Sequence, residues 1–417
     1  MKVLLLNQAF YPDVVATGQY LTPLALSLAR RGHEVTVVTS RRGYDDPSRT
    51  FPAREEWQGI RICRVPVTNF GKTARWRRGL DFASFMLSCW WRVFWLARQN
   101  AVVALTSPPL IAVLAAWLAG WWRIPFIYWM MDFNPDEAAA AGWLRPNSLL
   151  FRVLDSLSRY SLRRAARVIV LDRFMRERVL AKGIDPAKVV VLSPWAHDGQ
   201  VRFDPEGRER FRKQHGLDGK CVIMYSGNHT PVHSLATLCT AAERLSQEPD
   251  WVFCFVGGGS EWRALRDRVT TSQRPGNFSH ANVRCLPYQP LEALAASLSA
   301  ADIQVVVMGE PMVGVVHPSK VYNLLQVGVP MLYLGPEISP VADIMERTKQ
   351  TRCWAHARHG DVDAVVAAIR HLRQLRRSFS ADSGGAIEPW SQGAILPSLI
   401  QEIERLATSC AAPDGRR

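Results

Sequence analysis

At three quarters of its length the chain reads Gly314-Val315-Val316-His317-Pro318-Ser319-Lys320-Val321-Tyr322-Asn323-Leu324-Leu325-Gln326-Val327-Gly328-Val329-Pro330, and the apolar run Met331-Leu332-Tyr333-Leu334 follows. A proline fits the first turn of a helix, where its missing N–H is not needed. A glycine can end the helix with a positive φ. We therefore expect a helix over 318–327, closed by Gly328, and a buried strand over 331–334.

Polar residues gather at the start of this expected helix: His317, Ser319 and Lys320. A helix N-terminus carries unpaired N–H groups and partial positive charge, so it suits an anion, and Lys320 adds a full charge. The pattern favours a phosphate-bearing ligand at 318–320. The alternative is an ordinary turn between strand and helix whose lysine is simply solvated.

The stretch resembles the donor-site segment of the family-four retaining glycosyltransferases. That family ends the segment with Glu, then Gly five residues on, then Pro two residues later, and Asn323, Gly328 and Pro330 keep this spacing. The paired Glu of the family, eight residues earlier, falls on Val315, so both carboxylates are replaced. The chain is similar instead to the polysaccharide-assembly transferases that carry a Pro-Ser-Lys-x-Tyr segment.

The resemblance implies an α/β protein of GT-B fold, with two Rossmann-like doubly wound parallel-sheet domains facing a cleft. It implies an acceptor-side, membrane-facing domain over 1–195, a nucleotide-sugar domain over 196–380 and a helix over 388–408 that crosses back. The implied reaction moves a sugar, with retention, from a nucleotide diphosphate. A UDP-linked sugar such as an N-acetylated hexosamine is the expected donor, and a polyprenyl-diphosphate-linked or other glycan the expected acceptor, in cell-surface polysaccharide synthesis. No cofactor and no metal are expected.

Two other classes of protein remain open. A nucleotide-sugar epimerase of similar fold would use the same diphosphate contacts and would turn over the donor without an acceptor. A non-catalytic scaffold of the same fold would account for the missing carboxylates and would never consume the donor.

The composition is strongly basic, with 51 Lys and Arg against 37 Asp and Glu and a formal net charge of +14. This balance favours anionic partners such as nucleotide phosphates, lipid diphosphates and an anionic membrane surface. Nucleic acid is not expected as a partner, because the chain has neither a zinc-ligand spacing nor an RNA-binding motif. The eight cysteines form no CxxC pair and the N-terminal apolar run is too short for a signal peptide, so a cytoplasmic location is expected.

The N-terminal segment indicates a strand over 3–6, a loop over 7–18, a helix over 19–31 and a strand over 34–39, which is a unit of a parallel sheet. A GxGxxG turn is absent from the loop, which argues against NAD. The loop resembles the opening of the same transferase family, where it helps to hold the acceptor. On that resemblance the acceptor-side residues are Tyr11, Thr17, Gly18 and Gln19. His33 is expected to be a helix-end residue without chemistry.

Residues 75–131 are rich in tryptophan and arginine. Nine of the fifteen tryptophans of the chain fall between positions 76 and 143: Trp76, Trp90, Trp91, Trp95, Trp117, Trp121, Trp122, Trp129 and Trp143. Pro108-Pro109 interrupts the uncharged run 99–122, so a strand over 101–105, a helix over 110–122 and a strand over 125–130 are expected rather than a membrane span. The surplus of Trp and Arg favours a face that lies on the inner surface of the cell membrane. The alternative is a Trp-rich core, and how deeply 81–122 inserts is left open.

Three further segments supply the remaining candidate residues. Asp132 and Glu137 follow the expected strand 125–130 and are the candidate catalytic carboxylates; capping of the next helix is the alternative for such residues. In the second half, the family places Gly-Arg and a later Lys on the diphosphate. The matching positions are Gly227, Asn228 and His233, with Gly258 in a glycine turn beside the nucleotide. Because Asn228 and His233 bring less charge, Lys320 is expected to be the replacement cation, with Pro318, Ser319 and Asn323 beside it.

Overall fold

A computed structural model describes residues 1–409 except 14, 45, 47, 71–74, 198, 200, 272–281, 350–351 and 379–387. The predicted domain end at residue 380 lies outside the described residues. The chain divides into two compact units. Unit 1 consists of Met1–Ser193, Gly314–Val316 and the residues from Leu396 on, and unit 2 consists of Pro194–Val313 and His317–Ile395.

Unit 1 is built on an eight-stranded sheet with the order β3-β4-β2-β1-β5-β6-β7-β8. The strands are β1 (Lys2–Leu6), β2 (Glu34–Ser40), β3 (Arg54–Trp57), β4 (Ile60–Val65), β5 (Ala101–Ala104), β6 (Phe126–Trp129), β7 (Arg167–Val170) and β8 (Val189–Val191). All neighbouring strands run parallel except the edge hairpin β3–β4. The central strands are almost wholly buried and rich in Val, Leu and Ile, as expected for a parallel sheet covered on both faces.

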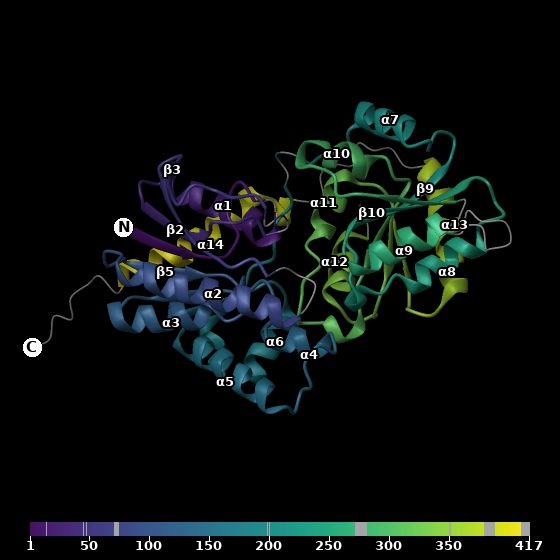
Figure 1. Ribbon diagram of the computed structural model, residues 1–417. Helices are drawn as coiled ribbons and strands as arrows, with labels where there is room; N and C mark the ends of the chain where they lie inside the picture. The colour runs from purple at the N-terminus through teal and green to yellow at the C-terminus, as the bar shows by residue number, and fades with distance from the viewer. Residues whose placement is uncertain are drawn as a thin grey trace, which may run out of the picture. The chain divides into compact units, whose positions relative to one another are not determined.

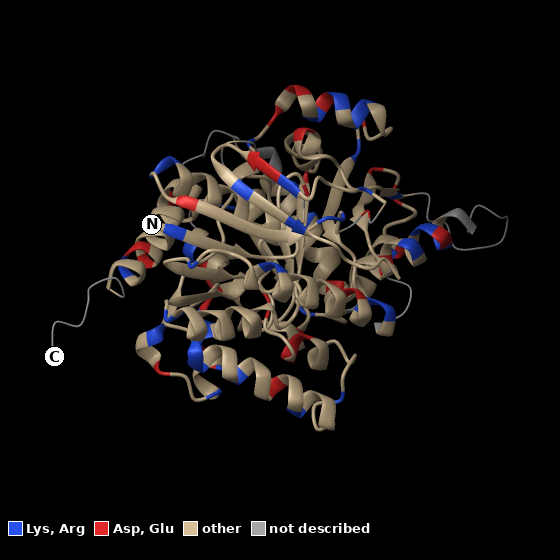
Figure 2. Cartoon of the chain, turned by 60° about the vertical axis from the view of Figure 1, so that its left-hand side comes forward, with Lys and Arg blue, Asp and Glu red and all other residues tan. Residues whose placement is uncertain are grey.

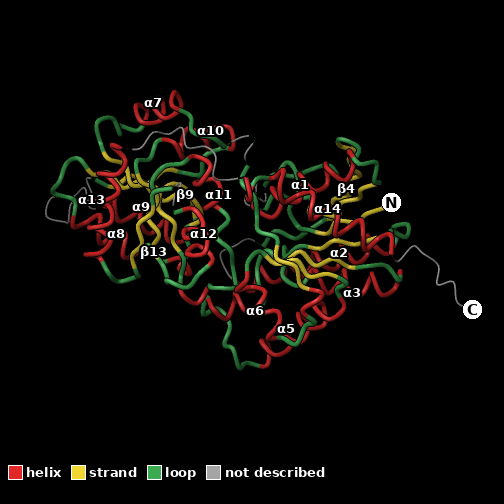
Figure 3. Tube along the Cα trace, turned by 180° about the vertical axis from the view of Figure 1, so that it is seen from behind, coloured by secondary structure: helices red, strands yellow, loops and turns green. Residues whose placement is uncertain are grey.

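Helices cover both faces of this sheet. They are α1 (Ala16–Arg30), α2 (Arg75–Phe94), α3 (Ile111–Trp122), α4 (Asp136–Ala140), α5 (Leu149–Arg164), α6 (Arg173–Ala181) and, from Leu396 on, α14 (Gln392–Ser409). Figures 1 and 3 show α1 and α14 on one face and α2 and α3 on the other. The last helix therefore fills a face that the local β-α-β connections leave open.

Unit 2 contains a six-stranded parallel sheet with the order β11-β10-β9-β12-β13-β14. Its strands are β9 (Cys221–Asn228), β10 (Trp251–Gly258), β11 (Val283–Leu286), β12 (Ile303–Val307), β13 (Met331–Leu334) and β14 (Trp354–Ala357). Its helices are α7 (Pro205–Gln214), α8 (Ala236–Arg244), α9 (Ser260–Thr271), α10 (Leu291–Ser299), α11 (Lys320–Val327), α12 (Pro340–Thr348) and α13 (Val362–Ser378). Figures 1 and 3 show α8, α9 and α13 on one face and α10, α11 and α12 on the other.

Charged residues lie mainly on the outer helices. Figure 2 shows most Lys, Arg, Asp and Glu on helices and loops, whereas most of the buried strands carry none. Within the described residues, no helix is both long enough and apolar enough to cross a lipid bilayer.

The predicted α/β class, with two doubly wound sheets, is confirmed. Three predicted boundaries were wrong. The first helix begins at Ala16 rather than residue 19, because Gly18 allows its first turn to approach the backbone of Ala9. Strand β9 continues to Asn228, because β10 pairs with it as far as Gly258. The helix expected from Pro318 begins at Lys320, with Ser319 as its N-cap.

Several elements were not predicted: the hairpin β3–β4, strand β14 and helices α2, α4, α7 and α9. Gly328 does end α11 in a left-handed conformation with φ 74°, and 331–334 is a fully buried strand, as predicted.

Candidate functional site

The most unusual charged group of unit 2 is Lys320, the first residue of α11. Its Nζ is buried and has no hydrogen-bond partner among the residues that the structure describes. It lies 3.5 Å from the centre of the Tyr225 ring, where the π-face attracts a cation. Burial lowers the pKa of Lys320 to about 7. A buried amine without an acceptor is costly, and an anionic ligand would supply the missing partner.

Glycines make room for this lysine at the ends of β9 and β10. A Cβ on Gly227 would lie 2.9 Å from Lys320 Nζ, and the φ of Gly227 is 143°. A Cβ on Gly257 would lie 2.0 Å from the carbonyl oxygen of Gly227, and one on Gly258 would lie 2.8 Å from the Tyr288 ring. Glycine at position 227 therefore leaves room for the ammonium group, and glycine at position 257 lets the ends of β9 and β10 approach closely.

Two histidines beside Lys320 contribute no further positive charge at neutral pH. Desolvation and the neighbouring Lys320 lower the pKa of both His229 and His233 to about 4. His229 Nδ1 lies 2.9 Å from the carbonyl oxygen of Gly227, and the backbone N–H of Gly309 donates to His233 Nδ1 at 3.4 Å. The positive charge of Lys320 therefore acts on His233. Asn228, in contrast, is exposed at the end of β9.

The N-terminus of α11 is held by side chains of its own segment. His317 Nε2 lies 2.8 Å from the Tyr322 hydroxyl, and the two rings stack. Pro318 is buried one residue before the N-cap, and the Ser319 side chain makes no capping hydrogen bond. In the first turn of α11, the N–H groups of Val321 and Tyr322 donate to the carbonyl oxygens of Pro318 and Ser319 at 3.1 and 3.2 Å.

Asn323 already has a structural partner. Its Oδ1 accepts a hydrogen bond from the backbone N–H of His197 at 2.9 Å, 126 residues away in the sequence. This bond ties α11 to the segment with which unit 2 begins. This bond was not predicted, because it depends on the tertiary position of His197.

In unit 1, Asp132 and Glu137 lie close enough to repel each other. Burial raises the pKa of Asp132, and burial together with the charge of Asp132 raises that of Glu137. Thr106 Oγ1 donates to Asp132 at 3.4 Å, and Arg78 partly offsets the repulsion on Glu137. Such a pair holds a proton more readily than isolated carboxylates do, which is the property of an acid–base site.

The chain segment 314–316 packs against this pair. Asp132 pairs with Val316 in an isolated β-bridge, and the N–H of Phe133 donates to the carbonyl oxygen of Val315 at 2.8 Å. Val315 is fully buried. Val315 brings no carboxylate to this position. The β-bridge between Asp132 and Val316 places the backbone of Asp132 close to Val315.

A buried ion cluster fixes the short helix that carries Glu137. Lys182 Nζ lies 2.7 Å from Asp136 Oδ2, also bonds to Asp155, and lies over the Phe133 ring. Asp136 directly precedes Glu137, so this cluster anchors α4 to α5 and to the end of α6.

The four residues predicted on the acceptor side have different surroundings within unit 1. Tyr11 is exposed and stacks on Trp57 with ring centres 4.0 Å apart. Thr17 is buried and accepts a hydrogen bond from Asn7 Nδ2 at 3.1 Å. Gly18 packs on Ala9, and Gln19 is half-buried one residue further along α1. Of these four residues, Tyr11 and Gln19 have side chains that are at least partly exposed to solvent.

Six aromatic residues of α2, α3 and the turn after α2 form an exposed group, here called the aromatic face: Trp90, Trp91, Phe94, Trp95, Trp117 and Trp121. Their side chains are between 39% and 63% exposed and contact one another in a continuous series of rings. Trp122 and Trp129, by contrast, belong to the core. The region therefore has both exposed and core tryptophans, and the membrane-facing surface stays a prediction.

Two residues beside Lys320, Tyr225 and His229, were missed as site candidates, as was Tyr288, which lies against Gly258. The position of Tyr225 and His229 around Gly227, at the carboxyl end of a parallel strand, was the available signal. Tyr288 follows β11, whose carboxyl end lies at the same edge of the sheet.

Comparisons with known proteins agree with this architecture. Residues 16–195 match the glycosyl transferase 4-like domain. The chain is 24% identical to WcaI of Escherichia coli K12, which is named as a colanic acid biosynthesis glycosyl transferase; the match covers 97% of this chain and 100% of WcaI. Among solved structures it resembles sucrose-phosphate synthase from Thermosynechococcus elongatus, with a TM-score of 0.73, 15% identity and coverage of 98% and 100%. It also resembles Anabaena HepE in complex with UDP-glucose, with a TM-score of 0.67, 14% identity and the same coverage.

Proposed function

Because this chain is a glycosyltransferase of the GT-B fold with a glycosyl transferase 4-like domain, we propose that it transfers a sugar from a nucleotide diphosphate sugar to a lipid-linked acceptor, with retention of configuration. The proposed setting is the synthesis of a cell-surface polysaccharide, in keeping with the name of WcaI. In this proposal unit 2 binds the donor and unit 1 binds the acceptor.

One observation carries the proposal: the buried Nζ of Lys320, which lies beside Gly227 at the end of β9 and has no hydrogen-bond partner among the described residues. A donor diphosphate needs a cation and N–H donors that approach without side-chain obstruction. In this proposal Lys320 supplies the charge and Gly227 supplies the open backbone. The same groups would stabilise the diphosphate as it leaves.

The donor contacts extend from Lys320 to its neighbours. Ser319 and Pro318 form the approach to α11, while Asn228, His233 and Gly258 lie on the two strand ends and the following turn. A UDP sugar is the first donor to test, because HepE was solved with UDP-glucose. Asn323 contributes by holding His197, and its amide nitrogen faces the donor side in this proposal.

The carboxylates of unit 1 act on the acceptor in this proposal. Burial raises the pKa of Asp132 to about 6, and burial together with the charge of Asp132 raises the pKa of Glu137 to about 7, so the two carboxyl groups hold a proton close to neutral pH. One of them accepts a proton from the acceptor hydroxyl as that oxygen bonds to the sugar. The ion cluster around Lys182 keeps Glu137 in position for this step.

The aromatic face supports an acceptor that resides in a membrane. Exposed indole rings favour the headgroup region of a bilayer, and arginines such as Arg77, Arg92 and Arg123 are attracted to anionic lipid. We place the protein on the inner surface of the cell membrane, attached peripherally through α2 and α3.

The decisive experiment incubates the purified chain with bacterial membranes and radiolabelled nucleotide sugars, followed by extraction of polyprenyl lipids. Labelled lipid is expected with wild type and with the surface control Lys220→Ala, but not with Lys320→Ala. Donor consumption that needs no acceptor would instead indicate an epimerase. Binding of donor or lipid without consumption of any donor would indicate a scaffold.

A further inference from the structure

The chain passes between unit 1 and unit 2 at four places: 193–194, 313–314, 316–317 and 395–396. Helix α11, whose first residue is Lys320, begins three residues after the third of these passages. Residues 194–197, here called the incoming segment, follow the first passage, and residues 388–395, here called the outgoing segment, precede the last one. Both segments belong to unit 2, as α11 does, and both are attached to α11.

The incoming segment is attached by two backbone N–H groups. That of His197 donates to Asn323 Oδ1 at 2.9 Å, and that of Ala196 donates to the carbonyl oxygen of Trp390 at 3.0 Å. Ala196 also pairs with Ser391 in an isolated β-bridge. The incoming segment is therefore bonded to α11 and, independently, to the outgoing segment.

The outgoing segment contacts α11 through aromatic rings. Trp390 is only 6% exposed, and the centre of its ring lies 6.1 Å from that of Tyr322. The other neighbour of the Tyr322 ring is His317, which stacks on it with ring centres 5.7 Å apart. His317 Nε2 also lies 2.8 Å from the Tyr322 hydroxyl. Three rings in a row thus connect the first residue after one chain passage to the segment that leads to another.

The residues just before His317 are fixed separately within unit 1. Gly314 has a φ of 71°, and a Cβ on it would lie 2.8 Å from the carbonyl oxygen of Phe174, so a larger residue does not fit. The carbonyl oxygen of Val315 accepts from the N–H of Phe133 at 2.8 Å. The chain that leads into α11 is therefore anchored whether or not a ligand is bound.

Resting on the proposed function, in which a diphosphate binds Lys320, we propose that Tyr322 and Trp390 are positioning residues of the donor site. Lys320 and Tyr322 lie in the same turn of α11, so a ligand that fixes the one also restricts the other. Through the rings and the bonds described above, this restriction reaches the incoming and the outgoing segments. Such coupling is reciprocal: loosening either segment weakens ligand binding by the same factor, typically about 5- to 150-fold.

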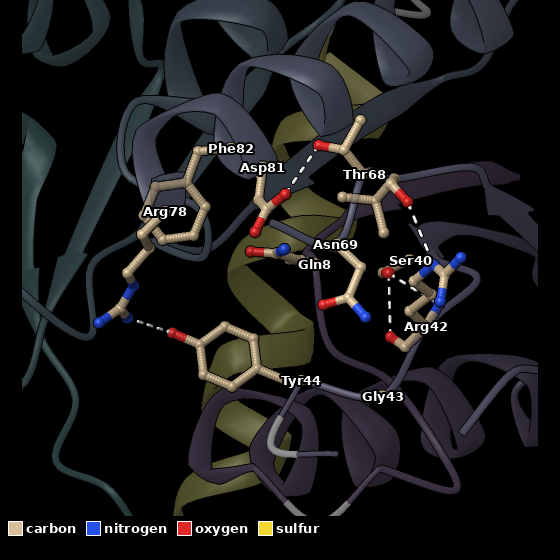
Figure 4. A pocket seen from close by; sticks show the side chains of 11 residues that line it. Gln8, Ser40, Arg42, Gly43, Tyr44, Thr68, Asn69, Arg78, Asp81 and Phe82 are labelled. Atoms are coloured by element: carbon tan, nitrogen blue, oxygen red, sulfur yellow. Dashed lines mark hydrogen bonds between the residues drawn. The ribbon is translucent and has the colours of Figure 1, made fainter. Parts of the chain in front are cut away.

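A tyrosine of unit 1 provides a matched control. Tyr44, Arg78 and Asp81 are among the residues that line a pocket in that unit (Figure 4). Arg78 Nη2 donates to the Tyr44 hydroxyl at 2.8 Å, which is the length of the bond between His317 and Tyr322. Tyr44→Phe and Tyr322→Phe therefore each remove a hydrogen-bonded hydroxyl, but only Tyr322 contacts the row of rings.

A second control comes from unit 2. Trp251 is 2% exposed and begins β10, at the opposite end of the strand from Gly258, and its indole N–H donates to Glu248 at 2.9 Å. Trp251→Leu removes a buried indole that is not part of the row of rings. It is the counterpart of Trp390→Leu, which removes one that is.

The test measures two properties of the full chain. Calorimetry gives the affinity for UDP and for inorganic diphosphate, and mass spectrometry gives hydrogen exchange at the amides of Ala196 and His197. In wild type, UDP should slow this exchange at least about fivefold. Trp390→Leu should bind UDP at least about fivefold more weakly and lose the slowing, whereas Trp390→Phe, which keeps a ring, should retain both. Tyr322→Phe should weaken UDP binding about twofold to tenfold, the effect of one hydrogen bond.

The controls Tyr44→Phe and Trp251→Leu should bind UDP as wild type does. A loss of affinity in Trp251→Leu as large as that in Trp390→Leu would reveal a general effect of core damage and overturn the inference. Equal UDP affinity in wild type and Tyr322→Phe would also overturn it. Tyr322→Phe removes a single oxygen atom, so this comparison decides even if Trp390→Leu does not fold.

The outcomes separate this coupling from the proposed function. UDP that binds wild type without changing exchange at Ala196 and His197 would overturn the inference and leave the proposed function intact. Wild type that binds neither UDP nor inorganic diphosphate would also overturn it, and the labelled-lipid assay would then judge sugar transfer by itself. If UDP slows the exchange as expected but no nucleotide sugar labels any lipid, the proposed function fails and the coupling stands.

Discussion

Lys320 combines a full charge with an environment that disfavours charge. Burial lowers its pKa to about 7, and the Tyr225 ring is its nearest favourable contact. A bound diphosphate would raise the pKa of Lys320 again, because a nearby anion stabilises the ammonium form. Binding and protonation of Lys320 are therefore linked.

This linkage predicts a pH-dependent donor affinity. Below about pH 7 the amine is already charged in the free protein, so it adds no pH dependence to UDP binding. Above that pH the complex must take up a proton, and the dissociation constant should rise by up to about tenfold per pH unit. Calorimetric titrations between about pH 6 and pH 9 check this for wild type, Lys320→Met and the control Lys220→Met. An equally steep rise in Lys320→Met would contradict the assignment.

Substitutions of Asn323 can distinguish two roles of its side chain, which are anchoring of His197 and direct contact with the donor. Removing its side chain removes the acceptor to which the His197 N–H donates at 2.9 Å, so Asn323→Ala should lower the free energy of unfolding by about 1–3 kcal/mol. Asn323→Asp keeps an acceptor oxygen and should remain close to wild type in denaturant unfolding. A direct donor contact predicts weaker UDP binding in both variants, whereas the anchoring role predicts that the Asp variant binds UDP normally.

At the scale of single elements, α2 stands out because one helix contributes to the pocket, to the aromatic face and, through Arg78, to the surroundings of Glu137. Its exposed face carries large rings where a water-facing helix normally carries charges. A bilayer surface would remove this apolar area from water.

We therefore expect weaker membrane binding when one aromatic residue of α2 and one of the following turn are replaced by polar residues. Trp91→Gln with Trp95→Gln should reduce partitioning onto vesicles of phosphatidylcholine and phosphatidylglycerol by about tenfold or more, since both rings are mainly exposed in the free protein. Vesicle co-sedimentation provides the measurement. Ile338→Gln, an exposed apolar residue of unit 2, should bind as wild type does.

Added salt gives an independent check of the same attachment. Attraction between arginine and anionic headgroups is screened by ions, so part of the wild-type protein should be released as the salt concentration rises. Vesicle binding that is insensitive both to salt and to the two Trp exchanges would contradict attachment through α2.

At the scale of the whole molecule, the chain completes unit 1 with its last described helix. Leu396, Leu399, Ile400 and Ile403 of α14 are buried, with the spacing of one helix face. Glu404 bonds to His33 and Arg31, and these two partners hold the pKa of Glu404 below its usual range. His33, expected to lack chemistry, thus ties the two ends of unit 1 together.

Removal of α14 should therefore destabilise unit 1 selectively. A chain ending at Ser391 exposes the core beneath four large apolar residues, and hydrogen exchange should become fast in β1 and β5 while β9 and β10 stay protected. Glu404→Gln is the mild counterpart, with an expected cost below about 1 kcal/mol for half-exposed ion pairs. Equal protection of both units in the shortened chain would contradict this role of α14.

Local sequence determined the elements whose signals are contained within a few residues. Gly328 ends α11 because only glycine readily adopts its left-handed conformation, and the apolar run 331–334 forms a buried strand. Alternating strands and helices then led to the two parallel sheets. The family resemblance was likewise readable from spacing, since Asn323, Gly328 and Pro330 keep their places.

Tertiary structure alone decided what surrounds each candidate residue. Lys320 lies beside Gly227, and Asn323 bonds to His197, in each case across at least 90 residues of sequence. Hydrogen bonding, desolvation and charge coupling depend on distance in space, so the state of Lys320 and the lining of the pocket cannot be read from neighbouring residues. The chain's own order predicts which elements form; packing decides which side chains are left buried without a partner and therefore available to a ligand.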